Sequence, residues 1–164
     1  MKCPACARSL TEVKVEDFVV NACQKGCGGI WFDHFELQKV EYQDEAAGEP
    51  LLTIEKDDTV TVDLNKKRNC PRCDMIMMQH FSSPSRKVTI DECPKCTGVW
   101  LDAGELAEIR SEFKSVADRE AKTEKFFNDV YRDQLNALHT HPAARIEKIT
   151  KAFSLISPGN FFRK

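Results

Sequence analysis

The chain contains Cys93-Pro-Lys-Cys96-Thr-Gly-Val-Trp100-Leu-Asp102, and this stretch with its copies decides the fold. The pair Cys70-Pro-Arg-Cys73 precedes it. The first half repeats the arrangement with Cys3-Pro-Ala-Cys6, Cys23-Gln-Lys-Gly-Cys27 and the tail Gly29-Ile-Trp-Phe-Asp33. Four thiolates in two close pairs suit a tetrahedral metal centre, for which zinc is the usual occupant. The sequence therefore predicts two zinc ions, with these ligands: Cys3, Cys6, Cys23, Cys27, Cys70, Cys73, Cys93 and Cys96.

Other uses of the cysteines fit less well. A disulfide framework needs an oxidising compartment, and the chain begins Met1-Lys-Cys-Pro4 without a secretory signal. No run approaches the roughly 18 apolar residues of a membrane-spanning helix, so we expect a cytoplasmic protein. Iron centres also use four cysteines and stay open. A thioredoxin-like redox pair explains one Cys-x-x-Cys, but not two repeated quartets.

Size and charge limit the function. Each four-cysteine segment spans about 40 residues, where a core rarely suffices without metal. Metal binding should therefore supply folding free energy to each module. The formal charge of the chain is −2 with neutral cysteines, and two zinc–thiolate centres would bring it to about −6. This charge is unfavourable for binding phosphate groups.

The two cysteine sets belong to a duplicated module. Six distinctive residues of the first half recur 69 positions later. They are Cys27, Trp31, Asp33, Glu36, Leu37 and Val40, which correspond to Cys96, Trp100, Asp102, Glu105, Leu106 and Ile109.

Strand-like segments lie between the cysteine pairs of each module. Residues 10–15 and 18–22 flank a turn in the first module, and residues 75–81 and 87–90 flank Ser82-Ser-Pro-Ser85 in the second. Each thiolate pair would sit on a tight knuckle, and a hairpin would bring the two knuckles together.

A helix is expected after each metal site. Asp33 with Glu36, and Asp102 with Glu105, have the spacing of a capping box, and an apolar face follows. The preceding tryptophans, Trp31 and Trp100, favour a core position, because a module of this size has few other large side chains to bury. The alternative is stacking on nucleic acid bases.

The remaining segments have less distinctive patterns. Between the modules, residues 51–54 and 59–64 alternate like short strands, and Lys66-Lys-Arg68 favours a solvated turn over a phosphate contact. Apolar residues from Leu106 to Leu138 recur at helical spacing, with a polar middle. Pro142 should end this element, and a second helix is expected over 143–156. The tail Asn160-Phe-Phe-Arg-Lys164 suggests docking onto the same chain or a partner.

No catalytic constellation is apparent. His34 and His80 are not needed as ligands beside four thiolates, and His139 and His141 favour an exposed helix terminus. The sequence lacks a Ser/His/Asp set, paired catalytic carboxylates, a phosphate-binding glycine loop and a His-Glu-x-x-His run. A four-thiolate zinc site also leaves no coordination position for a reactive water. We therefore expect a protein that is not an enzyme.

The second module resembles the small bacterial transcription factor IIB-type zinc-ribbon family. The resemblance rests on Cys70-Pro-Arg-Cys73, Cys93-Pro-Lys-Cys96 and the run Gly98-Val-Trp-Leu-Asp-Ala-Gly-Glu-Leu106. The first module departs from the family pattern in two places: three residues separate Cys23 from Cys27, and Phe35 stands where the family has glycine. The resemblance implies zinc and a ribbon fold, but it does not transfer a function.

These observations predict an α+β chain of four parts: a first zinc ribbon (1–42), an acidic linker with short strands (43–69), a second zinc ribbon (70–110) and a helical extension (111–164). The leading hypothesis is a zinc-binding adaptor that presents ribbon and helix surfaces to a protein partner, or self-associates through its C-terminal helices. The alternative is a nucleic-acid-binding ribbon protein of transcription or DNA metabolism. A metallochaperone or zinc store is weaker, because closed four-thiolate sites release metal reluctantly.

Overall fold

The computed structural model describes residues 1–140 of the chain. Two compact units are present, Met1–Glu120 and Ala121–Lys164, and each is described by itself. The first unit contains all strands of the described residues. The second contains most of the long helix α2 (Val116–Thr140). The predicted second helix over 143–156, Pro142 and the terminal phenylalanines lie outside the described residues.

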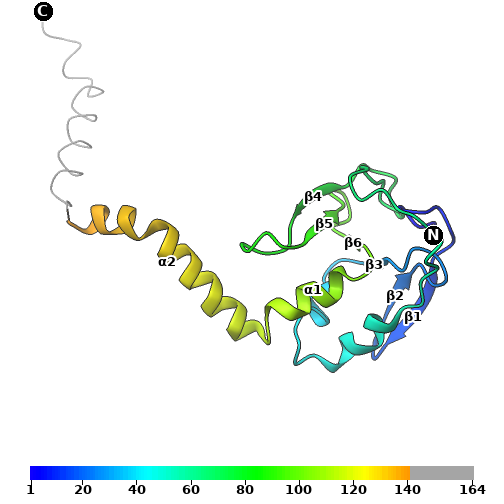
Figure 1. The fold of residues 1–164 in the computed structure, drawn as a ribbon, viewed down its shortest axis with the longest axis horizontal. Coiled ribbons are helices and arrows are strands. Elements are labelled where there is room, and N and C mark those ends of the chain that lie inside the picture. The colour runs from blue at the N-terminus through cyan, green and yellow to red at the C-terminus, as the bar shows by residue number, and fades with distance from the viewer. Residues whose placement is uncertain (141–164) are drawn as a thin grey trace, which may run out of the picture. The chain divides into compact units, whose positions relative to one another are not determined.

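The first unit is built on one six-stranded antiparallel sheet (Figure 1). Its strand order is β1-β2-β3-β6-β5-β4. The strands are β1 (Thr11–Val15), β2 (Phe18–Ala22), β3 (Ile30–Phe32), β4 (Met78–Phe81), β5 (Thr89–Glu92) and β6 (Val99–Leu101). Each ribbon contributes three strands, and the predicted hairpins are both present. With the helices that follow, this architecture confirms the predicted α+β class.

The two ribbons join through a local two-fold arrangement. Strands β3 and β6 pair antiparallel, so that Trp31 lies directly opposite its own repeat, Trp100. Ile30 pairs with Leu101 and Phe32 with Val99 on either side. The sheet is therefore continuous across both modules, which sequence reasoning had not anticipated.

Each tryptophan packs against a glycine of the other ribbon. A Cβ added at Gly29 would lie 2.2 Å from Cζ2 of Trp100, and one at Gly98 would lie 2.2 Å from Cζ2 of Trp31. Any larger residue at either glycine must displace an indole ring that is 0% exposed. The repeated Gly-x-Trp sequence thus encodes a reciprocal contact between the modules, and the core position predicted for both tryptophans is confirmed.

Alternation along the central strands separates two cores. On one face, both tryptophans and Met77 pack with cysteines of both sites. On the other face, Ile30, Phe32 and Leu101 join the main apolar cluster. That cluster also holds Val15, Phe18, Val20, Ala22, Val40, Ala47, Leu51, Val88, Ile90, Leu106 and Ile109. The metal clusters consequently border one core and leave the other to aliphatic and aromatic side chains.

The predicted helix starts are only partly correct. The second ribbon continues into α1 (Glu105–Glu112), whereas the first forms only the short 3₁₀ helix η1 (Leu37–Lys39). The glutamate half of each capping box is present: the amide of Asp33 donates to Glu36 and that of Asp102 to Glu105, at 2.8 and 2.7 Å. The aspartate half is wrong, because neither aspartate side chain caps a helix. Both instead accept a hydrogen bond from a tryptophan.

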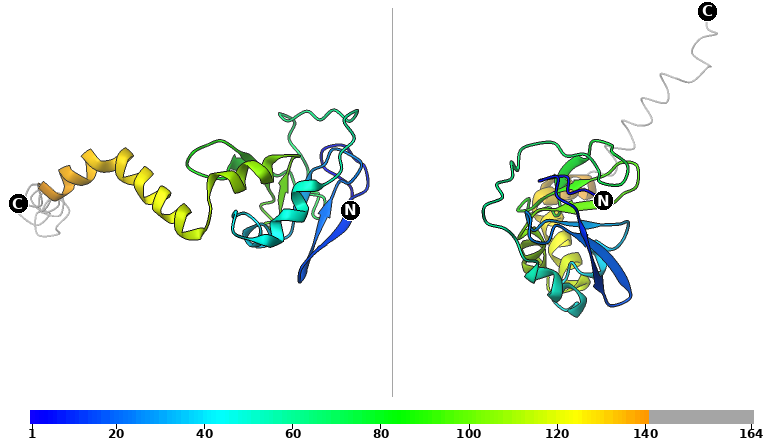
Figure 2. Two further views of the ribbon diagram at one scale, coloured as in Figure 1. Left: turned by 60° about the horizontal axis from the view of Figure 1, so that its bottom comes forward. Right: turned by 90° about the vertical axis from the view of Figure 1, so that its right-hand side faces the viewer.

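The linker is not built from strands. Residues 46–53 form the 3₁₀ helix η2 (Ala46–Thr53), and residues 59–64 run as an irregular loop (Figure 2). Buried Arg110 of α1 anchors the start of this region by donating to the carbonyls of Val40 and Glu45. The alternating pattern of 51–54 reflects packing of one face of η2 on the main core, with Leu51 buried.

The helical stripe predicted from Leu106 onward is interrupted. Helix α1 ends at Glu112, and α2 begins at Val116, where the carboxylate of Asp118 accepts the amide of Lys114. No helix among residues 1–140 is both long and apolar enough to cross a membrane.

We expect Gly98→Ala to destabilise both ribbons together, because the new methyl group must displace the buried indole of Trp31. Overpacking of this kind costs about 1–3 kcal/mol. Denaturant unfolding followed by tryptophan fluorescence measures the loss. Lys95→Ala, at an exposed position of the same ribbon, is the control and should change stability by less than about 0.5 kcal/mol. Equal midpoints for Gly98→Ala and the parent would contradict the packing argument.

Candidate metal centres

The eight cysteines form two compact clusters, as their spacing predicted. Within each cluster the four Sγ atoms all lie within 4.8 Å of one another. One cluster is Cys3, Cys6, Cys23 and Cys27, and the other is Cys70, Cys73, Cys93 and Cys96. None of them forms a disulfide. Among residues 1–140 no other group of histidine, cysteine or acidic side chains has this compactness.

The sulfur spacing fits zinc. A tetrahedral ion with Zn–S bonds of about 2.3 Å requires S···S distances of about 3.8 Å. Cys3 and Cys27 have their Sγ atoms 3.4 Å apart, as do Cys6 and Cys23. Cys70 and Cys96 in the second cluster are 3.7 Å apart. Both tetracysteine groups are therefore suited to binding one zinc ion each, and a bound ion would neutralise half of the thiolate charge.

All four knuckles share one backbone conformation. The residue after the second cysteine of each pair is left-handed: Ala7, Gly28, Asp74 and Thr97 have φ of 62°, 78°, 57° and 55°. In all four knuckles this residue's amide donates to the carbonyl of the first cysteine, as in Thr97 to Cys93 at 2.9 Å. The conformation turns the chain so that both thiols of a pair point to one side, and only one of the four positions is glycine.

Backbone amides also face the sulfur atoms. The amide of Cys6 lies 3.4 Å from Sγ of Cys3, and the amides of Arg72 and Cys73 lie 3.4 and 3.3 Å from Sγ of Cys70. Such donors stabilise a thiolate over a thiol. Burial works in the opposite direction and raises the pKa of Cys23 and of Cys70 to about 12. Metal binding must displace these protons, so metal affinity should fall as the pH is lowered.

The extra residue in the first ribbon's second knuckle serves as a contact with the linker. Lys25 is left-handed (φ 52°), and its amide donates to the carbonyl of Glu55 at 2.8 Å. Gly26 accepts from the amide of Asp57 at 2.8 Å. A Cβ at Gly26 would lie 2.5 Å from Sγ of Cys23, which explains the glycine. The inserted loop therefore holds the linker against the first cluster.

The basic triplet before Cys70 is not simply a solvated turn. Arg68 is 3% exposed and donates to the carboxylates of Asp91 and Asp102, each at 2.7 Å. The prediction of a solvated triplet was wrong for this residue. Its guanidinium ties strand β5 to the end of β6, beside the hydrogen bond from Trp100 to Asp102.

A second arginine connects the two modules. Arg72, inside the Cys70–Cys73 knuckle, donates to Asp33 of the first ribbon at 2.7 Å. Asp33 also accepts from Trp31 at 3.2 Å. The pair is partly exposed, so its stabilising contribution is small and its main effect is on the register of the ribbons.

The carboxyl of Glu105 is affected by its neighbours. Burial, with the nearby acidic groups Asp102 and Asp91, raises the pKa of Glu105 to about 7, although the amide of Asp102 and the charge of Arg68 oppose the shift. The residue therefore titrates near neutral pH.

The histidines lie away from the sulfur clusters. His34 contacts the hydroxyl of Thr97, and Nε2 of His80 lies 2.7 Å from a carboxylate oxygen of Glu92. Neither is grouped with the cysteines. The side chain of His139, and all of His141, fall outside the part of the chain that the structure describes.

Sequence reasoning missed the polar residues that support the clusters. Nothing in the pattern distinguishes Asp91 from an exposed strand residue, and Arg68 resembled its lysine neighbours. The paired glycines had a signal, because Gly29 and Gly98 occupy equivalent positions of the repeat. Their role, which is to leave space for the indole of the other ribbon, became clear only from the pairing of Trp31 with Trp100.

Comparison with known proteins agrees with the geometry. The family model described as transcription factor zinc-finger, a TFIIB-type zinc ribbon, matches residues 2–41 and 69–111. These matches cover both cysteine clusters and about half of the chain. No curated protein and no solved structure matches significantly.

Purified protein should contain two zinc ions per chain, each held by four thiolates. Cys96→Ser should reduce the content to one. Because Trp31 and Trp100 interlock, we also expect this change to lower the unfolding midpoint of the first ribbon, in addition to disrupting the second. Elemental analysis combined with denaturant unfolding checks both statements. Iron in place of zinc, or a first ribbon that unfolds as in the parent, would contradict them.

Glu105→Gln should alter the pH dependence of stability. A carboxyl whose folded-state pKa is raised from 4.5 to about 7 stabilises the fold when protonated, and this contribution is lost as pH rises through 7. Glutamine can still accept the Asp102 amide without ionising. The variant should therefore exceed the parent in stability at about pH 8, with a difference that shrinks toward pH 6. Urea titrations with saturating zinc measure this difference, and a constant offset would contradict it.

Proposed function

Since the chain belongs to the transcription factor zinc-finger family of TFIIB-type zinc ribbons, we propose that it is a zinc-binding adaptor without enzymatic activity. Its ribbons and its long helix would present rigid surfaces to a protein partner. In this role zinc stabilises the ribbons and does not take part in a reaction. The eight cysteines act as the ligands. Eight free thiols in two metal sites suit a reducing compartment, and we place the protein in the cytoplasm on this ground.

The observation that carries this proposal is how the arginines are used. Six of the seven arginines among residues 1–140 form ion pairs with carboxylates of the same chain. They are Arg8, Arg68, Arg72, Arg110, Arg119 and Arg132. The seventh, Arg86, lies over the ring of Phe81. A nucleic-acid-binding ribbon directs arginines at phosphates, so the use of these arginines within the chain supports a protein partner.

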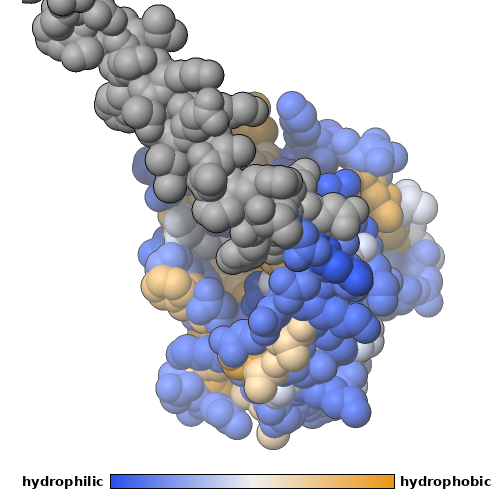
Figure 3. Space-filling view, turned by 90° about the vertical axis from the view of Figure 1, so that its left-hand side faces the viewer, coloured by the Kyte–Doolittle hydropathy of each residue, from blue (hydrophilic) through white to orange (hydrophobic). Residues whose placement is uncertain are grey.

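The surface also offers separate apolar areas. Figure 3 shows hydrophilic side chains over most of the coloured surface on that side, with smaller apolar areas between them. In the first unit, Met75, Ile76, Met78 and Phe81 of the second ribbon are each at least 46% exposed. Exposed apolar side chains of this kind are more typical of protein interfaces than of phosphate-binding faces.

Helix α2 supports self-association as part of the proposal. Phe127, Val130 and Tyr131 follow helical spacing and are 49%, 53% and 42% exposed. The rings of Phe127 and Tyr131 stack with centroids 6.0 Å apart, which gives the helix one aromatic face. A second copy of the same helix would cover this face with an equivalent stripe.

Affinity capture from native cells tests the adaptor function. Tagged full-length protein should retain a defined protein partner after nuclease treatment and at about 0.3 M salt, where weak phosphate contacts are lost. Cys96→Ser, which damages one ribbon, is the comparison bait and should lose the partner. A partner that disappears with nuclease would show the nucleic acid role instead.

Binding to DNA and RNA oligonucleotides should be weak and should disappear by about 0.2 M salt, because few phosphates can be neutralised. Fluorescence anisotropy over a salt series measures this. Submicromolar, sequence-selective binding at that salt would overturn the preference for a protein partner.

Phe127→Ala should weaken self-association. If the aromatic face is buried between two copies, truncation costs roughly 3–5 kcal/mol per packed ring. Light scattering over a concentration series should show a dimer for the parent and a shift toward monomer for the variant. Lys125→Ala, on the opposite side of the helix, is the control. A parent that remains monomeric at all concentrations would contradict the proposed self-association.

A further inference from the structure

The duplication creates two equivalent grooves at the edge of the main core. Each is lined by the residues that follow a tryptophan strand in one ribbon and by the last knuckle and final strand of the other. Seven lining residues of one groove correspond to seven of the other at the 69-residue spacing of the repeat. In the first groove these are Asp102, Ala103, Gly104, Leu106, Ala107, Gly28 and Ile30; in the second they are Asp33, His34, Phe35, Leu37, Gln38, Thr97 and Val99.

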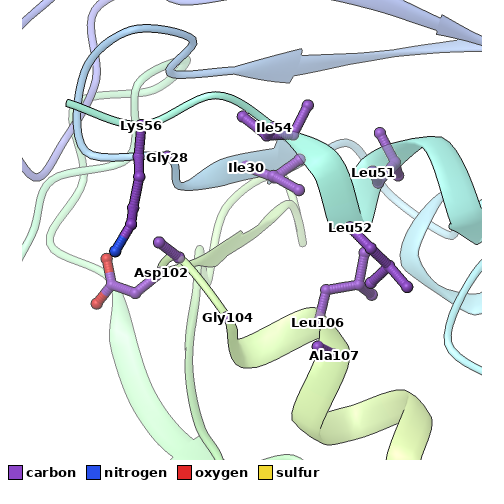
Figure 4. A pocket seen from close by; sticks show the side chains of 11 residues that line it. Gly28, Ile30, Leu51, Leu52, Ile54, Lys56, Asp102, Gly104, Leu106 and Ala107 are labelled. Atoms are coloured by element: carbon purple, nitrogen blue, oxygen red, sulfur yellow. The ribbon is translucent and has the colours of Figure 1, made fainter. Parts of the chain in front are cut away.

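The first groove, here called the linker-lined groove, has one wall supplied by the linker. Its four remaining lining residues are Leu51, Leu52, Ile54 and Lys56, and all come from the linker. Figure 4 shows them on a segment across from α1, with Lys56 pointing toward the carboxylate of Asp102. The chain itself therefore covers one side of this groove with a short aliphatic segment, and Nζ of the following Lys56 pairs with Asp58 at 3.1 Å.

The second groove, here called the open groove, has no linker segment across it. Its other walls come from β4, β5, α1 and the start of α2, and its floor contains Ile90, Val99 and Ile109. The cavity is larger, about 360 Å³ against about 250 Å³ for the linker-lined groove. Within residues 1–120 no further segment covers this apolar lining, so it is available to another chain.

The open groove also presents an aromatic side chain in a strained position. Phe35 has φ 65° and is 59% exposed, whereas its equivalent Gly104 has φ 92°. A left-handed bulky residue costs of order 1–3 kcal/mol and is retained where surrounding structure or function requires it. Phe35 has no core role at this exposure, and its ring centroid lies 3.4 Å from that of His34 at the groove rim.

The charged side chains around the open groove determine which residues can flank a bound segment. Asp33, Glu41 and Glu92 line the open groove together with Arg119, and Arg72 pairs with Asp33 at 2.7 Å. Arg119 is engaged with Glu41 at 2.9 Å. Three carboxylates against two arginines leave an acidic excess at the rim, which disfavours phosphate and favours a basic flank on the occupant.

We propose that the open groove is the docking site for a short aliphatic segment of a partner protein, flanked by basic residues and seated as Leu51–Ile54 seats in the linker-lined groove. This inference rests on the proposed adaptor function and names its recognition surface. Phe35 acts as the exposed aromatic anchor, and Ile90 with Val99 receives the aliphatic side chains.

A peptide derived from the linker provides the probe. It carries residues 49–56 with Glu49→Lys and Glu55→Lys, so that the Leu-Leu-Thr-Ile core gains basic flanks. Added to isotope-labelled, zinc-loaded full-length protein, it should cause saturable amide shifts below about 1 mM peptide. The shifts should centre on residues 33–38, 80–82 and 97–99. The unmodified acidic peptide, and one with Leu52→Asn and Ile54→Asn, are the matched controls and should bind more weakly.

Phe35→Gly is the decisive protein variant, because it installs the residue that the sister groove has at this position. It should bind the basic peptide at least about fivefold more weakly, with stability equal to or above that of the parent, because the left-handed strain is relieved. Leu52→Ala in the linker-lined groove is the control and should leave peptide affinity unchanged.

Shifts that map to the linker-lined groove, no saturable shifts, or an unchanged affinity of Phe35→Gly would each overturn the inference. A single-stranded DNA oligonucleotide that perturbs residues 34 and 35 more strongly than the peptide would do so as well. The affinity-capture experiment distinguishes failure of the adaptor function from failure of the docking groove. A nuclease-resistant partner that Phe35→Gly retains leaves the adaptor function standing and rejects the groove, whereas a partner lost with nuclease rejects both.

Discussion

The structure depends on one reciprocal contact, in which the indole of each repeat packs against the glycine of the other. Trp31 and Trp100 meet across β3 and β6, and Gly29 and Gly98 leave space for their rings. A ribbon of about 40 residues cannot bury such a side chain alone. Pairing the two copies solves this, because each module completes the other's core. The same contact fixes the strand register, and with it the positions of both cysteine clusters.

This arrangement gives the metal sites a shared surrounding. Cysteines of both clusters pack around the same pair of tryptophans, and Arg72 links one knuckle to Asp33 of the other ribbon. Arg68 secures the second ribbon by a buried ion pair with Asp91 and a partly buried one with Asp102. A buried pair of this kind adds little over an apolar substitute, but removing one partner leaves an uncompensated charge. Its effect is therefore to favour a single arrangement of β5 and β6.

The two ribbons are copies of one module, but their sequences differ around the two grooves. The linker lines only one of these grooves. The inserted residue at Lys25 lets the second knuckle of the first ribbon hold residues 55–57, and η2 then covers the neighbouring groove. The open groove has no such segment among the described residues, and it has His34 and Phe35 at the positions of Ala103 and Gly104. Duplication thus supplied two equivalent grooves, and the linker lines one of them. The other is lined by an exposed aromatic side chain and an acidic rim, on which the proposed docking site rests.

The sequence by itself determined the ligand clusters, the hairpins and the buried tryptophans. These follow from local spacing: Cys-x-x-Cys forms a knuckle, alternation forms a strand, and a large indole in a small module has to be buried. It did not determine the pairing of β3 with β6, the burial of Arg68 between Asp91 and Asp102, or the 3₁₀ path of residues 46–53, where alternation predicted strands. Only the tertiary structure decided these, because each depends on contacts between residues far apart in the chain. The residues next to a charged or apolar side chain in the sequence do not show whether that side chain faces water or packs against the other module.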